Sequence, residues 1–485
     1  MGKEIAKLEP QKLWNNFYNL TQIPRPSKKE ERIIAFVEKF GIDLGLETIV
    51  DQTGNVIIRK PATKGFENRQ GVILQGHLDM VPQKNSDTIH DFEADPIQAY
   101  IEGEWVTAKG TTLGADNGIG AAAAMAILES NDIEHGPIEA LFTIDEETGM
   151  TGATELKPNF LKGDILINLD SEDEGELYIG CAGGINTTAI FNYSEENPKE
   201  NYKSYRIAVK GLKGGHSGLD IILKRGNANL IMNKILIKAN EHFGIMLSEI
   251  EGGNLRNAIP REAFALVAIP QEKDLLFIKL VKEIKAQFLD VLTDDEGLSI
   301  SLEEIDMPKK FIDTKTTTNL LNSISICPNG VIKMIDALPD VVETSSNLAV
   351  VKSENGQIKV LSLQRSSSEE AKNKLCVELK ELFEEYNAKV IQDGDYPGWN
   401  PNPDSDILST MKNVYLENFG KTPEVKVIHA GLECGILGAT YPNWDMISFG
   451  PTIRFPHSPD EKVNIKSVDM FWKYLIETLK NIPVK

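Results

Sequence analysis

Two residues able to bind a metal ion follow an apolar run early in the chain. The run GVILQ, residues 71–75, leads into His77 and Asp79. A short apolar run bounded by polar residues and glycine is typical of a buried strand. Residues i and i+2 of an extended segment point to the same side, so Asp79 can reach the ring nitrogen of His77 that faces away from a metal. Asp79 would then fix the tautomer of His77.

Residues of the same kinds follow other predicted elements. A glycine-rich turn in TTLGADNGIG places Asp116 just before an Ala-rich helix expected from about residue 118. The other predicted strands and the residues that follow them are EALFTI (139–144) with Asp145, Glu146 and Glu147, DILINL (164–169) with Asp170, and WDMISFG (444–450) with His457.

Strands that alternate with helical patterns predict an α/β fold, with a mixed, mostly parallel sheet covered by helices on both faces. Such sheets bind ligands outside the carboxyl ends of their strands, so His77, Asp116, Glu147, Asp170 and His457 are expected to converge. Two imidazoles and three carboxylates suit zinc, and also manganese or cobalt, better than calcium. Five ligands are too many for one zinc, but they suffice for two ions roughly 3.5–4 Å apart if one carboxylate bridges them. Asp116 is the expected bridge, because a helix N-terminus tolerates negative charge.

Glu146 and Glu147 are neighbours, and adjacent side chains tend to point in different directions. One can therefore bind a metal while the other acts on water. A metal lowers the pKa of water toward about 7, and a carboxylate that accepts the proton completes a general base. We assign Glu146 as the base and Glu147 as the ligand, although the spacing alone also allows the reverse.

Composition narrows the class of protein and of partner. The length of 485 residues predicts two domains, and the 41% hydrophobic and 25% charged residues are typical of a folded soluble protein. The net charge of -21 argues against nucleic acid and membrane surfaces as partners. Four scattered cysteines without a CxxC pair predict neither a thiolate zinc site nor a disulfide framework. Because no export signal is recognisable, a cytoplasmic location is expected.

The middle of the chain interrupts the ligand-bearing pattern. We expect a catalytic domain of residues 1–186 and 401–485, and an inserted α+β domain of residues 187–400 that ends in the Pro- and Gly-rich linker DGDYPGWNPNPDS. The insert shows strand and helix patterns in the ferredoxin-like order β-α-β-β-α-β. A partial second copy, beginning with an amphipathic stretch at 316–338, would make two such halves.

Four positions beyond the ligand set are weaker candidates. GLKGGHSG places His216 among glycines that would let backbone approach a ligand, and GNLRNAIPRE and LSLQRSS contain Asn257 and Arg365. A guanidinium could bind a substrate carboxylate through two parallel hydrogen bonds, but turn and surface roles fit these residues equally well. The glycine-rich turn HAGLECG, with Gly431, could line a pocket.

Two further features receive a structural interpretation. GIGAAA (118–123) fits a loose dinucleotide-binding pattern, but no apolar strand directly precedes it. Its glycines and alanines are therefore expected to pack a helix closely on the sheet. His90, His135 and His242 lie in polar segments and are expected to be solvated.

As a set, the motifs resemble those of a known family. GHLDMV, TLGADNGIG, DEETGMTGA, LDSED, KGGHSG, NLRNAIPRE, HAGLECG and PHSPDE occur in the order found in dinuclear zinc metallopeptidases of the carboxypeptidase G, peptidase T and carnosinase type. Among these, the chain is most similar to the aminoacyl-histidine dipeptidases, also called Xaa-His dipeptidases or peptidase D. The motifs span nearly the whole chain and are highly specific together.

The resemblance implies roles that spacing does not give. The insert would be a lid or dimerisation domain of a homodimer, and His216 would stabilise the carbonyl oxygen of the scissile bond, in some relatives from another subunit. The remaining implied roles are one zinc on His77, Asp116 and Asp170, a second on Asp116, Glu147 and His457, catalysis by Asp79 and Glu146, and substrate contacts from Asn257, Arg365 and Gly431.

The expected function is metal-dependent hydrolysis of dipeptides, preferring Xaa-His substrates such as carnosine, with Glu146 as general base. A tripeptidase or N-acyl amino acid deacylase would keep the metals and differ in its substrate pocket. A non-catalytic metal- or peptide-binding protein would bind without turnover, and Glu146 beside a full ligand set argues against it. A nucleotide-dependent oxidoreductase rests on GIGAAA alone.

Overall fold

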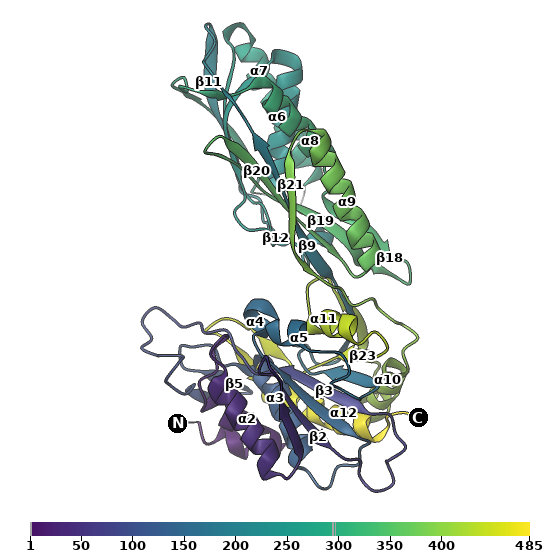
Figure 1. The fold of residues 1–485 in the computed structure, drawn as a ribbon. Coiled ribbons are helices and arrows are strands. Elements are labelled where there is room, and N and C mark those ends of the chain that lie inside the picture. Colours follow the sequence, from purple (N-terminus) through teal and green to yellow (C-terminus); the bar gives the residue numbers. More distant parts are fainter. Residues whose placement is uncertain (1, 293–294, 296) are drawn as a thin grey trace. The chain divides into compact units, whose positions relative to one another are not determined.

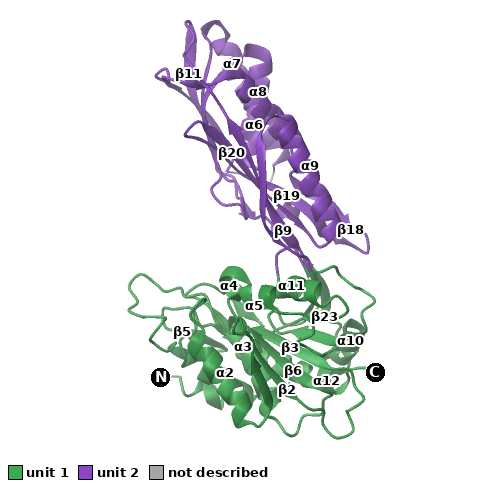
Figure 2. Cartoon of the chain, in the orientation of Figure 1, with its two compact units in different colours: residues 1–180, 399–427, 432–485 green, residues 181–398, 428–431 purple. Residues whose placement is uncertain are grey.

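The chain forms two compact units, coloured separately in Figure 2. The computed structural model describes residues 2–292, 295 and 297–485. Unit 1 comprises residues 1–180, 399–427 and 432–485, and unit 2 comprises residues 181–398 and 428–431. The expected insert of residues 187–400 begins and ends within a few residues of the main segment of unit 2. The return of residues 428–431 to unit 2 is not foreseen by the sequence patterns.

Unit 1 is built on an eight-stranded mixed sheet (Figure 1). In sheet order its strands are β1 (Glu47–Val50), β2 (Val56–Lys60), β6 (Ile138–Thr143), β3 (Val72–His77), β7 (Ile165–Asn168), β23 (Asp445–Ser448), β8 (Glu176–Cys181) and β22 (Glu424–Ile428). The central strands β6, β3, β7 and β23 are parallel to their neighbours within this group, whereas β1, β2 and β8 pair antiparallel. Every residue of β3, β6 and β7 is buried, as expected for strands covered on both faces.

Five helices of unit 1 share one apolar core with this sheet: α1 (Gln11–Thr21), α2 (Glu31–Asp43), α3 (Ala115–Glu129), α10 (Asp406–Phe419) and α12 (Ile465–Lys480). The Ala-rich helix α3 is almost entirely buried. A Cβ atom on Gly120 would lie 2.5 Å from the carbonyl oxygen of Leu169, so this glycine allows the close packing expected of GIGAAA. The other helices are α4 (Glu146–Gly149), α5 (Thr151–Glu155) and α11 (Glu433–Thr440). A small second sheet contains β24 (Ile453–Arg454), β25 (Lys462–Asn464), β5 (Trp105–Ala108) and β4 (Ala99–Glu102).

Unit 2 is an antiparallel sheet with helices packed on it (Figure 1). In sheet order the strands are β16 (Ser299–Ile305), β11 (Tyr202–Lys210), β15 (Ala263–Pro270), β13 (Met246–Gly252), β19 (Leu338–Glu354), β20 (Gln357–Ser366), β9 (Gly183–Asn192) and β21 (Lys389–Tyr396), and β18 (Gly330–Ile335) pairs with β19. The helices are α6 (Ala228–Phe243), α7 (Asp274–Val291), α8 (Thr314–Ile326) and α9 (Glu369–Glu385). Two short pairs join β12 (Gly215–His216) to β14 (Ala258–Ile259) and β10 (Glu195–Glu196) to β17 (Phe311–Ile312).

The sheet of unit 2 contains two halves of the β-α-β-β-α-β type. The first half is β11, α6, β13, β15, α7 and β16. The second is β9, α8, β19, β20, α9 and β21, so its first strand precedes the whole first half in the sequence. The amphipathic stretch 316–338 is not a single element, because α8 ends at Ile326 and β18 follows. No helix among the described residues is long and apolar enough to cross a membrane.

Candidate active site

One group of predicted ligands forms where β3 and β7 end. These strands are parallel neighbours with Gln75 opposite Asn168, so His77 and Asp170 each lie two residues beyond a paired position. Asp116 approaches them from the start of α3. The Nε2 atom of His77 lies 3.2 Å from Oδ1 of Asp116 and 3.4 Å from Oδ1 of Asp170. Each of the three residues offers a ligand atom within 4.8 Å of the others.

A second group shares Asp116 with the first. The Oδ2 atom of Asp116 lies 3.2 Å from Nε2 of His457, which in turn lies 2.9 Å from Oε2 of Glu147. Glu147 is in the first turn of α4, just after β6, and His457 is in the loop between β24 and β25. Because Asp116 presents one oxygen to each histidine, it has the geometry expected of a bridging ligand.

The donor set fits two divalent cations. Oε1 of Glu147 and Oδ1 of Asp170 are buried and have no hydrogen-bond partner among the described residues. Burial, together with the charge of Asp116, raises the pKa of Asp170 to about 8. Hydrogen bonds to Asp116 and Glu147 raise the pKa of His457 to about 11. Crowded carboxylates with spare oxygen atoms are the environment that a metal cation stabilises.

Asp79 holds both His77 and the start of α4. The Nδ1 atom of His77 faces the carbonyl oxygen of Asp79 at 3.2 Å and its Oδ1 at 3.4 Å, so backbone and side chain together fix the tautomer. The carboxylate also accepts hydrogen bonds from the backbone N–H groups of Glu146 and Glu147, at 3.0 and 3.2 Å, and from Ser27 Oγ at 2.8 Å. Burial opposes ionisation, but bonds from His77, Ser27 and Glu146 outweigh it and lower the pKa of Asp79 to about 2.

Glu146 has the surroundings of a proton-accepting group. Its carboxylate lies within 4.8 Å of ligand atoms of His77 and Glu147. Burial, and then the charges of Asp170, Glu433 and Glu147, raise the pKa of Glu146 well above its usual range. Glu147 also contacts His457, with its Oε2 atom 2.9 Å from Nε2, which joins it to the second group.

Buried polar side chains that the sequence analysis missed lie beneath the ligands. Glu433, at the start of α11, accepts hydrogen bonds from Gln75 Nε2 at 2.6 Å and Thr143 Oγ1 at 2.7 Å. Gln75 accepts a bond of 2.6 Å from Asn168. These contacts tie β3, β6 and β7 together just before their ligands. Gln75 and Asn168 are polar residues inside apolar runs, and this is the sequence signal that could have revealed these two side chains.

The weaker candidates of the sequence analysis gather in unit 2. β12 pairs with β14, which places His216 opposite Ala258, and the N–H of Ser217 donates to the carbonyl oxygen of Asn257 at 2.8 Å. Asn257 is exposed, whereas the guanidinium of Arg365 is buried. Arg365 donates to Tyr396 Oη at 2.7 Å and forms no ion pair with a carboxylate among the described residues.

Two histidines of this cluster are held in their neutral forms. The Nδ1 atom of His216 accepts the backbone N–H groups of Gly218 and Leu219, which leaves the proton on Nε2, and burial and Arg365 lower the pKa of His216. His429, missed by the sequence analysis, lies two residues before Gly431, and its Nε2 contacts Ser345 Oγ at 2.7 Å. Burial, then the charges of Arg365 and His216, lower the pKa of His429 to about 3.

Two other histidines are not solvated as expected. His135 is fully buried, with Nδ1 2.7 Å from the carbonyl oxygen of Gly136, and His90 is buried with its ring edge-on to Phe92. Tertiary packing closes over both of these locally polar segments. His242 is exposed, as expected.

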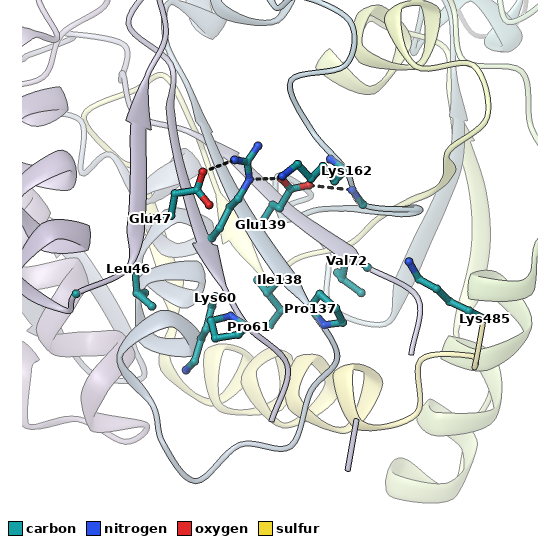
Figure 3. A pocket seen from close by; sticks show the side chains of 14 residues that line it. Leu46, Glu47, Lys60, Pro61, Val72, Pro137, Ile138, Glu139, Lys162 and Lys485 are labelled. Atoms are coloured by element: carbon teal, nitrogen blue, oxygen red, sulfur yellow. Dashed lines mark hydrogen bonds and ion pairs between the residues drawn. The ribbon is translucent and has the colours of Figure 1, made fainter. Parts of the chain in front are cut away.

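The pocket in Figure 3 lies at the opposite, amino ends of β3 and β6. It has a volume of about 480 Å³. Its two glutamates are already paired, because Arg59 binds Glu47 at 2.6 Å and Glu139 at 2.8 Å. It therefore does not compete with the ligand cluster as the candidate active site.

Comparisons with known proteins find relatives that match nearly the whole chain. Residues 73–481 match the model of peptidase family M20/M25/M40. The chain is 44% identical to the cytosol non-specific dipeptidase of Escherichia coli (strain K12), over 99% of this chain and 100% of that protein. The crystal structure of aminoacylhistidine dipeptidase from Vibrio alginolyticus has a TM-score of 0.96 and 46% identity, and covers 99% of this chain and 98% of that chain. Aminopeptidase PepT from Bacillus cereus, at 18% identity and a TM-score of 0.57 over 98% of this chain and 99% of that chain, shares the fold.

Proposed function

Because the chain belongs to peptidase family M20/M25/M40, we propose that it is a metal-dependent dipeptidase. The observation that carries the proposal is the pair of three-residue ligand groups that share Asp116, with Glu146 beside them. Two relatives, at 44% and 46% identity over 99% of this chain, are named a non-specific dipeptidase and an aminoacylhistidine dipeptidase, which supports dipeptides as substrates.

Two divalent ions complete the proposed site, with zinc preferred and manganese or cobalt as alternatives. His77, Asp116 and Asp170 would hold one ion, and Asp116, Glu147 and His457 the other. Ions there supply Lewis acidity, which polarises a peptide carbonyl and lowers the pKa of water. Asp79 keeps His77 in the tautomer that leaves Nε2 free to bind.

The proposed proton transfers run through Glu146. It takes a proton from the attacking water and delivers it to the amine that leaves when the C–N bond breaks. A pKa raised by burial suits a group that must both accept and return a proton. His216 donates from Nε2 to the carbonyl oxygen as negative charge develops on it, in this subunit or from a second one.

Arg365 is proposed to bind the substrate's terminal carboxylate. Its guanidinium is buried and has no acidic partner among the described residues, so a bound carboxylate would stabilise its charge. Asn257 and Gly431 are proposed to contact the substrate backbone. A dipeptide has a free carboxylate one residue after the cleaved bond and a free amine one residue before it, whereas a longer chain lacks at least one of the two.

Three finer points belong to the proposal. A preference for Xaa-His substrates is supported by the name of the Vibrio relative, and a cytoplasmic location by the name of the Escherichia coli relative. A homodimer through unit 2 is supported by the edge strand β16. Among the described residues this strand pairs only with β11, so its other edge can pair with a second copy of the chain. Light scattering would measure the dimer directly.

The test is a substrate panel with zinc- or manganese-loaded protein. Dipeptides, including β-alanyl-histidine, are compared with tripeptides and N-acyl amino acids, with and without chelator. Chelator-sensitive cleavage of dipeptides alone supports the proposal, and a ranking led by Xaa-His substrates supports that preference. Cleavage confined to N-acyl amino acids or tripeptides would overturn the substrate class.

A matched pair of variants tests the role of Glu146. Glu146→Gln should lower kcat about 10²- to 10⁴-fold while both ions stay bound. Glu155→Gln, an exposed glutamate on α5, is the control and should keep full activity. Near-normal turnover by Glu146→Gln would contradict the proposed mechanism.

A further inference from the structure

A buried carboxylate outside the ligand set holds the turn that carries Asp116. Oε2 of Glu461 accepts the backbone N–H groups of Leu113 and Gly114 at 2.7 and 2.9 Å. Oε1 accepts those of Ala115 and Asp116 at 2.8 and 3.2 Å. Four consecutive N–H groups thus converge on one side chain that is only 2% exposed.

A buried arginine holds the same turn from its carbonyl side. Arg25 donates to the carbonyl oxygens of Leu78, Asp79 and Gly114. Gly114 has a positive φ of 71°, and a Cβ atom there would lie 2.5 Å from the Arg25 guanidinium. The turn therefore has little room to move on either side.

Glu461 also belongs to the segment that carries His457. The two residues are four apart in the loop between β24 and β25, and the carbonyl oxygen of Glu461 accepts a hydrogen bond of 2.8 Å from Thr107 Oγ1 on β5. This carboxylate is thus a direct link between the backbone of Asp116 and the backbone near His457.

We infer that Glu461 is a positioning residue that keeps Asp116 and His457 at the separation needed to bind one of the two ions. The inference rests on the proposed two-metal function. Metal ligands depend on the groups that orient them, and loss of such a group typically lowers metal affinity about 10- to 100-fold.

The two ions should not depend on Glu461 equally. His77 and Asp170 follow strands that pair directly with each other, so they keep their separation without Glu461. Glu147 and His457 come from a helix start and a half-exposed loop. The ion between Asp116, Glu147 and His457 is therefore the one that Glu461 secures.

The test compares Glu461→Gln with a matched control, Glu139→Gln. The glutamine keeps one acceptor oxygen but turns an NH2 group toward two N–H donors. Glu139 is also a buried carboxylate that accepts two backbone N–H groups, those of Lys162 and Gly163, but it lies at the amino ends of the strands (Figure 3). Bound metal is counted by mass spectrometry of the metal-loaded, desalted full chain during titration with chelator, and folding is checked by circular dichroism.

We expect two ions per chain in the wild type and in Glu139→Gln, and one tightly held ion in Glu461→Gln, with the affinity for the second lowered about 10- to 100-fold. Two ions bound to Glu461→Gln with wild-type affinity would overturn the inference. If that variant does not fold, Glu461→Asp decides, because it keeps the charge on a side chain one carbon shorter; undiminished affinity for the second ion would again overturn it. A wild type that binds fewer than two ions would instead overturn the two-metal function, so the two failures are distinguishable.

Discussion

His429 should make the stability of unit 2 sensitive to mildly acidic pH. This residue is 7% exposed, and burial, then Arg365 and His216, lower the pKa of its imidazole to about 3 from an ordinary value of 6.5. Between these two values the unfolded chain binds a proton that the folded chain does not, so the free energy of unfolding falls as the pH falls. From pH 7 to pH 5, about 1.5 pH units lie within this window, which corresponds to a loss of about 2 kcal/mol.

The variant His429→Asn removes the titrating group and should lose about 2 kcal/mol less than the wild type over this interval. The difference is measured by urea unfolding at pH 7 and pH 5 of protein from which a chelator has removed metal. Hydrogen exchange of peptides from unit 2 reports the unfolding of that unit. His242→Asn, which replaces an exposed histidine on α6, is the control and should behave like the wild type. Equal losses in the wild type and His429→Asn would refute the reasoning.

Three further variants test individual contacts of the proposed site. Asp79→Asn keeps one acceptor oxygen for the four donors that meet Asp79. It should lower metal affinity about 10- to 100-fold, measured by competition with a chelator, and unchanged affinity would count against an orienting role for Asp79. Arg365→Lys should raise KM for dipeptides about 10-fold with kcat little changed, because a lysine cannot form the two parallel bonds of a guanidinium; the same KM as wild type would refute carboxylate binding. His216→Asn should lower kcat about 10²- to 10³-fold with both ions retained, and a change in KM alone would contradict its role at the carbonyl oxygen.

The ligand cluster can be predicted from the sequence because of strand geometry. A parallel strand places its last residues at one edge of the sheet, so the runs before His77 and Asp170 were enough to predict that these side chains meet. Asp116 was recognisable because a glycine-rich turn precedes its helix. The family resemblance then separated the five residues into two groups, and the structure contains the same two groups.

The side chains that support the ligands cannot be predicted from sequence patterns in the same way. Glu461 and Arg25 bind backbone N–H and carbonyl groups, which every residue has, so no pattern of side chains reveals the partner. His90 and His135 were wrongly expected to be solvated, because local polarity does not report what packs over a segment.

The fold of unit 2 shows a similar limit of sequence patterns. The first half followed from the alternation of strands and helices. The first strand of the second half, β9, is separated from its partners β20 and β21 by more than the whole first half. Local periodicity cannot show a pairing over that distance.

The most direct test of the central claim is to restore metal to chelated protein while measuring cleavage of a dipeptide such as β-alanyl-histidine. If the chain is a two-metal dipeptidase, the chelated protein releases no histidine, and full activity returns as the second equivalent of zinc or manganese binds. Cleavage that survives complete removal of metal, or no cleavage of any dipeptide with two ions bound, would contradict the account.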